Sequence, residues 1–361
     1  MRIVAKIGTA SITDDQGRID HRAIERLTDE VAVLRAAEHQ VVIVSSGAVA
    51  AGVGALGLDR RPADMQTLQA VSAVGQSRLM EAYNAEFARH DLIGAQLLVD
   101  PFDFVERRQY LHLRTTLNRL LELGVVPIMN ENDAIANDEL RYGDNDFIAA
   151  LVANSMAADV LVLLTDMDGV FTADPRRDSS ATLIPFVRSS DPLLSITADA
   201  GGSGRGSGGM ATKLMAARMA SWSGIRSVIA RASRRGVLAG SASNELVGTT
   251  FEAHDRALSA RKLWIAFAAE VNGTVHVDTG AQAALTEHPN SLLPAGVVRV
   301  TGEFERGDVV DVAGPDGGVF ARGIASLGAV DVENAHGRHT SDLPEGMTHT
   351  IVHRDDLVVL A

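Results

Sequence analysis

Short apolar segments alternate with amphipathic segments over residues 1 to about 262, and this alternation constrains the fold more than any other feature of the chain. The segments RIVAKIG, QVVIVSSG, GAQLLVD, VVPIMN, DVLVLLT and RSVIA are typical of strands. Helical spacing of apolar residues marks the stretches between them, for example Tyr110, Leu113, Leu117 and Leu120 ahead of a terminal Gly124. Continuously apolar strands alternating with helices indicate an α/β fold, a mostly parallel sheet sandwiched by helices.

Ligands of such sheets bind beyond the carboxyl ends of the strands. We therefore expect the loops that follow Gly8, Ser46, Asn130 and Thr165 to converge on one crevice.

The last ninety residues have a different pattern. The short β-like segments GTVHVDTG, GVVRVTG, GDVVDVAGPDGG and HRDDLVVL are separated by Gly and Pro-Asp-Gly turn signals. This pattern predicts a small all-β barrel or sandwich. We place the first domain at residues 1–264 and the second at residues 272–361.

Charge and composition restrict the classes of partner. The formal net charge of −13 argues against binding nucleic acid by bulk electrostatics. The absence of cysteine excludes disulfides, thiolate metal sites and a thiol nucleophile. No signal peptide or membrane span is recognisable, so we expect a soluble cytoplasmic protein.

Two loops near the N-terminus present groups that suit an anion. Lys6 lies at the end of the first strand, just before Gly8, and an exposed lysine stem is the alternative reading with even odds. Ser46 and Gly47 lead into an Ala-rich helix, whose unpaired amides favour a carboxylate or phosphate. A plain serine N-cap is compatible with that reading.

Acidic and amide side chains cluster after two later strands. NENDAIA, which contains Asp133, follows VVPIM, and YGDNDF supplies Asn145 and Asp146. These groups can hold an ammonium group or position lysines. A calcium-binding loop is the main competitor, but the spacing lacks the terminal glutamate of an EF-hand. Ordinary use of Asn and Asp in turns remains the alternative for each segment. Thr165 and Asp166 end another strand. A nucleotide base or ribose could lie there, and a turn that binds no ligand is the equal alternative.

The segment GRGSGGMATK, residues 204–213, is either a flexible linker or a phosphate cradle. It is not a Walker loop, because no Gly-Lys-Ser/Thr follows at the required spacing. A helix predicted to begin at about Gly209 places Thr212 and Lys213 in its first turn. A lysine there is unfavourable for the helix dipole unless an anion binds, which favours the cradle.

Taken in order, these stretches resemble the amino acid kinase family, and within it the members that phosphorylate glutamate. The resemblance covers nearly the whole chain, and the final β-rich part resembles a PUA domain. The matching blocks are AKIGTA, SSGAVAAG, AVGQSRL, VVPIMNENDAIA, YGDNDF, LLTDMDGVFTADPR, GSGGMATK, SLLPAG and VHRDDL.

The resemblance implies ATP-dependent phosphorylation of the γ-carboxylate of L-glutamate to L-glutamyl 5-phosphate, the first step of proline biosynthesis. It implies Mg²⁺ carried by the ATP phosphates, proline as a feedback inhibitor and a homo-oligomer, a dimer or tetramer. The implied catalytic residues are Lys6, Asp146 and Lys213; the implied glutamate-binding residues are Ser46, Asp133 and Asn145. The implied ATP-binding residues are Lys6, Gly8, Thr165, Asp166, Ser207, Gly208, Gly209, Met210, Ala211, Thr212 and Lys213.

Some positions depart from the family pattern, namely Ala10, His112, Leu113 and Phe147. None removes a proposed chemical group, but they leave open the shape of the glutamate pocket and of any regulatory site.

Other functions remain to be weighed against this one. A family kinase could act on a carbamate, an aspartate or a nucleotide, and a silent sensor could keep the fold. PUA-like domains elsewhere bind RNA, but residues 272–361 contain five Arg and no Lys against thirteen Asp and Glu. We therefore expect a structural or oligomer-contacting role for this part. His336 and His339 could form a metal pair, although surface histidines are the more ordinary explanation.

Overall fold

The computed structural model describes residues 1–14, 18–104, 106–135, 145–191, 193, 209–255, 257–267, 269, 271–338 and 349–360. The predicted site positions Ser207 and Gly208 lie outside these residues, as do Asp144 and the first half of the segment 204–213, residues 204–208. The chain divides into two compact units, Met1–Leu258 and Ser259–Ala361. The boundaries that we drew from the sequence, at 264 and 272, stay predictions.

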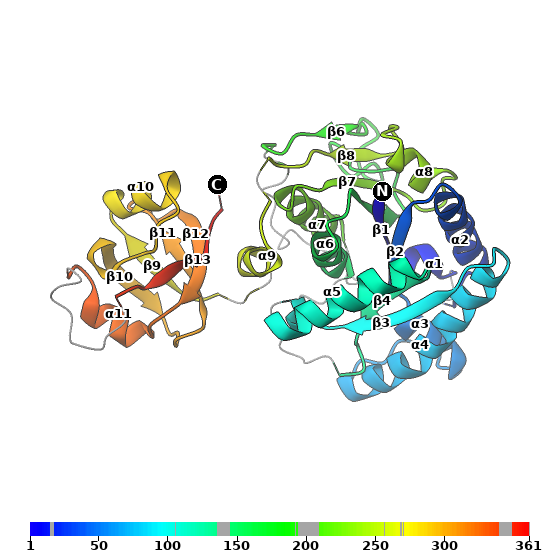
Figure 1. Cartoon of the computed structure of the whole chain (residues 1–361), viewed down its shortest axis with the longest axis horizontal. Coiled ribbons are helices and arrows are strands. Elements are labelled where there is room, and N and C mark those ends of the chain that lie inside the picture. The colour runs from blue at the N-terminus through cyan, green and yellow to red at the C-terminus, as the bar shows by residue number, and fades with distance from the viewer. Residues whose placement is uncertain are drawn as a thin grey trace. The chain divides into compact units, whose positions relative to one another are not determined.

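The first unit is built on an eight-stranded sheet with the order β3-β4-β2-β1-β5-β7-β8-β6 (Figure 1). All neighbours are parallel except β7 and β8, which pair antiparallel. The predicted mostly parallel sheet is thereby confirmed. Its strands are β1 (Arg2–Ile7), β2 (Gln40–Ser45), β3 (Gly94–Val99), β4 (Val126–Glu131), β5 (Val160–Thr165), β6 (Phe186–Val187), β7 (Arg226–Arg231) and β8 (Thr249–Phe251).

Helices pack on both faces of this sheet. The helices are α1 (Thr9–Ile12), α2 (His21–Ala36), α3 (Ala48–Ala55), α4 (Met65–Ala88), α5 (Arg107–Glu122), α6 (Asn145–Ser155), α7 (Met210–Trp222) and α8 (Val237–Ala242), with a 3₁₀ turn η1 at Pro101–Phe104. Strand residues Ile3, Ala5 and Ile7 join the core formed with α2 and α4. Because side chains alternate along a strand, Lys6 belongs to the opposite face of β1, and α6 packs against this strand.

Helix α6 is a central element of the first unit that the sequence analysis did not assign. Its residues from Asn145 to Ala153 are all buried. A helix that is apolar on every side has no amphipathic period, and it forms where other elements surround it completely. Asn145 and Asp146, which the sequence offered as site residues, lie in the first turn of this buried helix.

The predicted apolar face of the helix that ends before Gly124 was partly wrong. Helix α5 buries Leu117 and Leu121, whereas Tyr110, Leu113 and Leu120 are half-buried. Gly124 does end this helix in the left-handed conformation, with φ at 79°.

Two glycines set the distance between α3 and α4. A Cβ atom at Gly75 would lie 1.7 Å from the carbonyl oxygen of Ala48, and one at Gly52 would lie 1.9 Å from that of Val71. Only glycine allows the two helix backbones to pack so closely. Since α3 begins just after Ser46, this contact also fixes the loop between β2 and α3.

The second unit contains a five-stranded sheet with the order β10-β9-β11-β12-β13. Its strands are β9 (Val271–Val277), β10 (Val297–Gly302), β11 (Val309–Ala313), β12 (Val319–Ala325) and β13 (Val352–Val359). The predicted separate β domain is confirmed, but helices accompany the sheet: α9 (Ala260–Phe267), α10 (Thr279–Glu287) and α11 (Ala329–Ala335), with a 3₁₀ turn η3 at Pro294–Gly296. Helices α10 and α11 are short, and the strand pattern on either side of them is the stronger signal, so the sequence analysis predicted strands alone.

Across the described part of the chain, no helix is both long and apolar enough to cross a membrane.

Candidate active site

Lys6, Asp146 and Lys213 come from three separate elements and form one ion-paired cluster. Lys6 Nζ lies 2.6 Å from Asp146 Oδ1, and Lys213 Nζ lies 3.0 Å from Oδ2. The Asp146 side chain is fully buried, while those of Lys6 and Lys213 are 2 % and 7 % exposed. The hydroxyl of Thr212 also donates to Asp146 Oδ2, at 2.9 Å. The sequence prediction that two distant lysines meet at one carboxylate is thus matched by this geometry.

The cluster carries two ammonium groups on one carboxylate. Burial alone would raise the pKa of Asp146, but the charges and hydrogen bonds of Lys6 and Lys213 lower it below its usual value. The carboxylate is therefore ionised, and the three groups together have a net charge of +1. A buried excess charge is costly unless an opposite charge joins it, so this cluster suits an anionic ligand.

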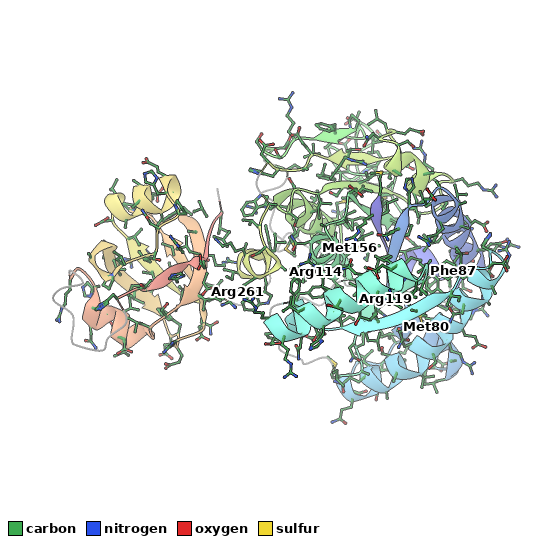
Figure 2. All side chains as sticks on the ribbon, viewed as in Figure 1. Met80, Phe87, Arg114, Arg119, Met156 and Arg261 are labelled. Atoms are coloured by element: carbon green, nitrogen blue, oxygen red, sulfur yellow. The ribbon has the colours of Figure 1, made fainter. Side chains whose placement is uncertain are left out.

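Lysine is rare in this protein, which makes its placement informative. Of the 33 basic residues, only Lys6, Lys213 and Lys262 are lysines. The arginines Arg114, Arg119 and Arg261, labelled in Figure 2, are exposed. Two of the three lysines therefore lie buried at one point.

The first turns of α6 and α7 adjoin this cluster, and the two helices pack side by side (Figure 1). Helix α7 starts after Gly209, which makes no side-chain capping bond, and its first turn contains no acidic residue. Thr212 donates to the Gly209 carbonyl and to Asp146, so its side chain ties the two helix starts together. Met210 and Ala211 complete the first turn, and the amides of a helix N-terminus favour an anion bound there.

Ser46 and Asn145 are joined in a second group, made of uncharged side chains. Asn145 Nδ2 donates to Ser46 Oγ at 2.9 Å and to Asn130 Oδ1 at 2.8 Å. Asn130 Nδ2 in turn donates to Gln76 Oε1 at 2.9 Å, and Gln76 Nε2 donates to Gln96 Oε1 at 3.0 Å. Sequence reasoning missed Gln76 and Gln96, although AVGQ stands in one of the matching blocks.

Asp133 lies in the turn after β4 and accepts a hydrogen bond from Ser72 at 3.2 Å. Burial raises the pKa of this carboxyl group, while the Ser72 bond and the charge of Arg61 oppose the shift. A partly buried carboxylate with a raised pKa gains stability from an additional cation, such as an ammonium group.

Thr165 and Asp166 end β5, as the sequence predicted. Thr165 is buried and its hydroxyl donates to Asp166 Oδ1 at 3.0 Å, while Asp166 is exposed. The neighbouring Asp168 pairs with Arg231 at 2.6 Å. Gly8 follows β1, and a Cβ atom there would lie 3.5 Å from Lys6 Nζ, so the backbone approaches the ammonium closely.

A family model described as "Amino acid kinase family" matches residues 1–231, which is more than half of the chain. The chain belongs to the amino acid kinase family. A second model, described as "PUA domain", matches residues 273–347. Both resemblances drawn from the sequence are confirmed.

Several proteins resemble this amino acid kinase over its length. Two are named glutamate 5-kinase, from Burkholderia lata and Burkholderia ambifaria; each is 42 % identical over 363 aligned positions, with 99 % of this chain and 98 % of the relative covered. Among solved structures, the UMP kinase of Bacillus anthracis is 16 % identical, with a TM-score of 0.47, and covers 72 % of this chain and 98 % of its own.

Proposed function

We propose that this protein is a glutamate 5-kinase, which transfers the γ-phosphoryl group of ATP to the side-chain carboxylate of L-glutamate, the first step of proline biosynthesis. The observation that carries the proposal is the buried cluster in which Lys6 and Lys213 share Asp146. The relatives named glutamate 5-kinase support the choice of acceptor.

The chemistry requires no general base. The side-chain carboxyl of glutamate has a pKa of about 4.3, so the nucleophile is already ionised at neutral pH. One of its oxygens attacks the γ-phosphorus, the bond to the β,γ-bridging oxygen breaks, and ADP and an acyl phosphate result. Both partners are anions, so catalysis consists of positioning and of charge stabilisation.

Lys6 and Lys213 would supply that stabilisation. In the proposal, both ammonium groups contact the transferred phosphoryl group, and Asp146 orients them from behind. Because the carboxylate lies between them, the two like charges can be held close together without an anionic ligand. Phosphate oxygens would bring negative charge to this pair of ammonium groups.

We assign glutamate to the side of the crevice formed by Ser46, Asp133 and Asn145. The partly buried carboxylate of Asp133 suits the α-ammonium group, and the Ser46 hydroxyl suits a carboxylate. We assign ATP to the opposite side, with Gly8, Thr165, Asp166 and the segment 207–213. The start of α7, a helix N-terminus with no acidic residue in its first turn, supports phosphate binding there.

Mg²⁺ belongs to the proposal as a companion of ATP. The described residues do not offer it a protein cage: no three His, Asp or Glu side chains among them come together, and Asp146 is engaged by both lysines. The ATP phosphates would hold the ion, which would neutralise part of their charge.

The family resemblance adds finer expectations. We propose cytoplasmic activity, inhibition by proline, and assembly into a dimer or tetramer. For the second unit we propose a structural or oligomer-contacting role; its net charge of −8 over residues 272–361 gives an RNA backbone little to bind.

Release of ADP in the presence of ATP and Mg²⁺ tests the function. L-glutamate should support turnover, while aspartate and acetylglutamate should support less than a tenth of it, since one methylene or a blocked ammonium removes a matched contact. Added proline should lower the rate with glutamate. Faster turnover with aspartate, a carbamate or a nucleotide would replace this function by that of another kinase of the family.

A further inference from the structure

We propose that Gln76 of α4 is a positioning residue for the glutamate site, which fixes the direction of the Ser46 hydroxyl through Asn130 and Asn145. The proposal rests on the proposed function. Gln76 lies two side chains away from Ser46 along the hydrogen-bonded chain and is only 6 % exposed.

The main chain determines the orientation of these amides. The N–H of Glu131, in β4, can only donate, and it donates to Asn130 Oδ1 at 2.9 Å, with Asn145 Oδ1 as a second, longer acceptor at 3.3 Å. Asn130 Oδ1 also accepts from Asn145 Nδ2 at 2.8 Å, so both of its lone pairs are in use. Asn130 is 1 % exposed, and turning its amide over would place an NH₂ group against two donors.

This orientation gives Gln76 a specific task. With its oxygen occupied, Asn130 has to direct its NH₂ group toward Gln76, whose Oε1 accepts it at 2.9 Å. Without that acceptor, a buried donor is left unpaired, and the Asn130 side chain is held from one end only. The adjacent Gly75 packs against the Ala48 carbonyl, so α4 presents Gln76 from a fixed position.

At the other end of this hydrogen-bonded chain, the orientation of the Asn145 amide determines which hydrogen bond Ser46 can make. Asn145 Nδ2 has two hydrogens; one goes to Asn130 Oδ1 and the other to Ser46 Oγ. Because Ser46 Oγ accepts from Asn145, its own proton points elsewhere, as a donor suited to a substrate carboxylate. The chain of amides thus keeps Ser46 a donor to the ligand, and Gln76 is the support that nothing local in the sequence reveals.

The test is Gln76→Met in the full-length protein, which replaces the amide with an apolar side chain of similar length. We expect the KM for glutamate to rise roughly tenfold, as for loss of one buried polar partner, with the KM for ATP changed less than about twofold. Gln96→Met is the matched control. Gln96 is exposed, so water can replace it as the acceptor for Gln76, and the KM for glutamate should change by less than about twofold.

A double-mutant cycle separates positioning from a general loss of packing. In a Ser46→Ala background, which lacks the hydroxyl, Gln76→Met should raise the KM for glutamate by much less than in the wild type. Equal effects in both backgrounds, or an unchanged KM in the single variant, would overturn the proposal. If Gln76→Met does not fold, Gln76→Asn withdraws the acceptor while staying polar, and the same comparison applies. Failure of the wild type to use glutamate at all would instead refute the proposed function.

Discussion

Each unit of the molecule contains ion-paired side chains that involve its central sheet, and the two groups differ in the balance of positive and negative charge. In the second unit, Arg322 and Asp311 are directly opposite each other on β12 and β11, 2.7 Å apart and 20 % and 17 % exposed. That pair is neutral and reaches water. In the first unit, Lys6, Asp146 and Lys213 carry an excess positive charge in the interior. A balanced pair is complete with two groups, whereas two buried ammonium groups around one carboxylate form a place where an anion is stabilised.

The largest effect is expected for Asp146→Asn. This change removes the carboxylate and leaves two buried ammonium groups without it, which should destabilise the first unit by about 3–5 kcal/mol. Hydrogen exchange of the β1 and β5 amides measures the loss in this unit alone. Exchange rates equal to those of the wild type would show that the lysines do not depend on Asp146.

The pH dependence of the stability lost in Asp146→Asn gives a second test of the buried cluster. Because Lys6 and Lys213 outweigh burial and lower the pKa of folded Asp146, its contribution to stability is fully present above the unfolded value of about 3.9. It disappears as the pH falls through the lower, folded pKa. The stability difference between wild type and Asp146→Asn should therefore be constant near pH 7 and shrink in strong acid; a difference that grew in acid would contradict the assigned direction.

The next effect concerns turnover in Lys213→Ala. Removing one donor to the transferred phosphoryl group should lower kcat about a hundredfold, or roughly 3 kcal/mol, with the KM for glutamate changed less than about twofold. Lys262→Ala is the control. Its ammonium donates to the Arg354 carbonyl within the second unit, so both constants should stay close to those of the wild type. Normal turnover of Lys213→Ala would remove this lysine from the reaction.

The smallest effect is expected for Arg322→Leu. Loss of a half-exposed pair and of the bond to the Ala266 carbonyl should cost the second unit about 1 kcal/mol. Hydrogen exchange of the β11 and β12 amides reports it, while kcat and both KM values should not change. A hundredfold loss of kcat in this variant would mean that Arg322 and Asp311 contribute to the reaction and that their role is not only structural.

The sequence was sufficient for six of the eight strands in the first sheet, all but β6 and β8, and for the expectation that the charged residues meet. The strand segments are continuous and apolar, and the order of the matching blocks implied that Lys6, Asp146 and Lys213 act together. It was not sufficient for α6, because a helix buried on every side has no amphipathic period. It also gave no signal for Gln76, since a glutamine in a long helix is ordinary until the fold places Asn130 beside it.

The close contact of α3 with α4 limits how the pocket could be re-engineered. Even a single methyl group at Gly75 or Gly52 would collide with a carbonyl oxygen, so the spacing of these helices is already at its lower bound. A designer who wished to admit a longer or shorter amino acid could not narrow the pocket by moving α3 inward. Adjustments would have to come from the side chains in the turn that follows β4, where the proposal places Asp133 against the ammonium group of the substrate.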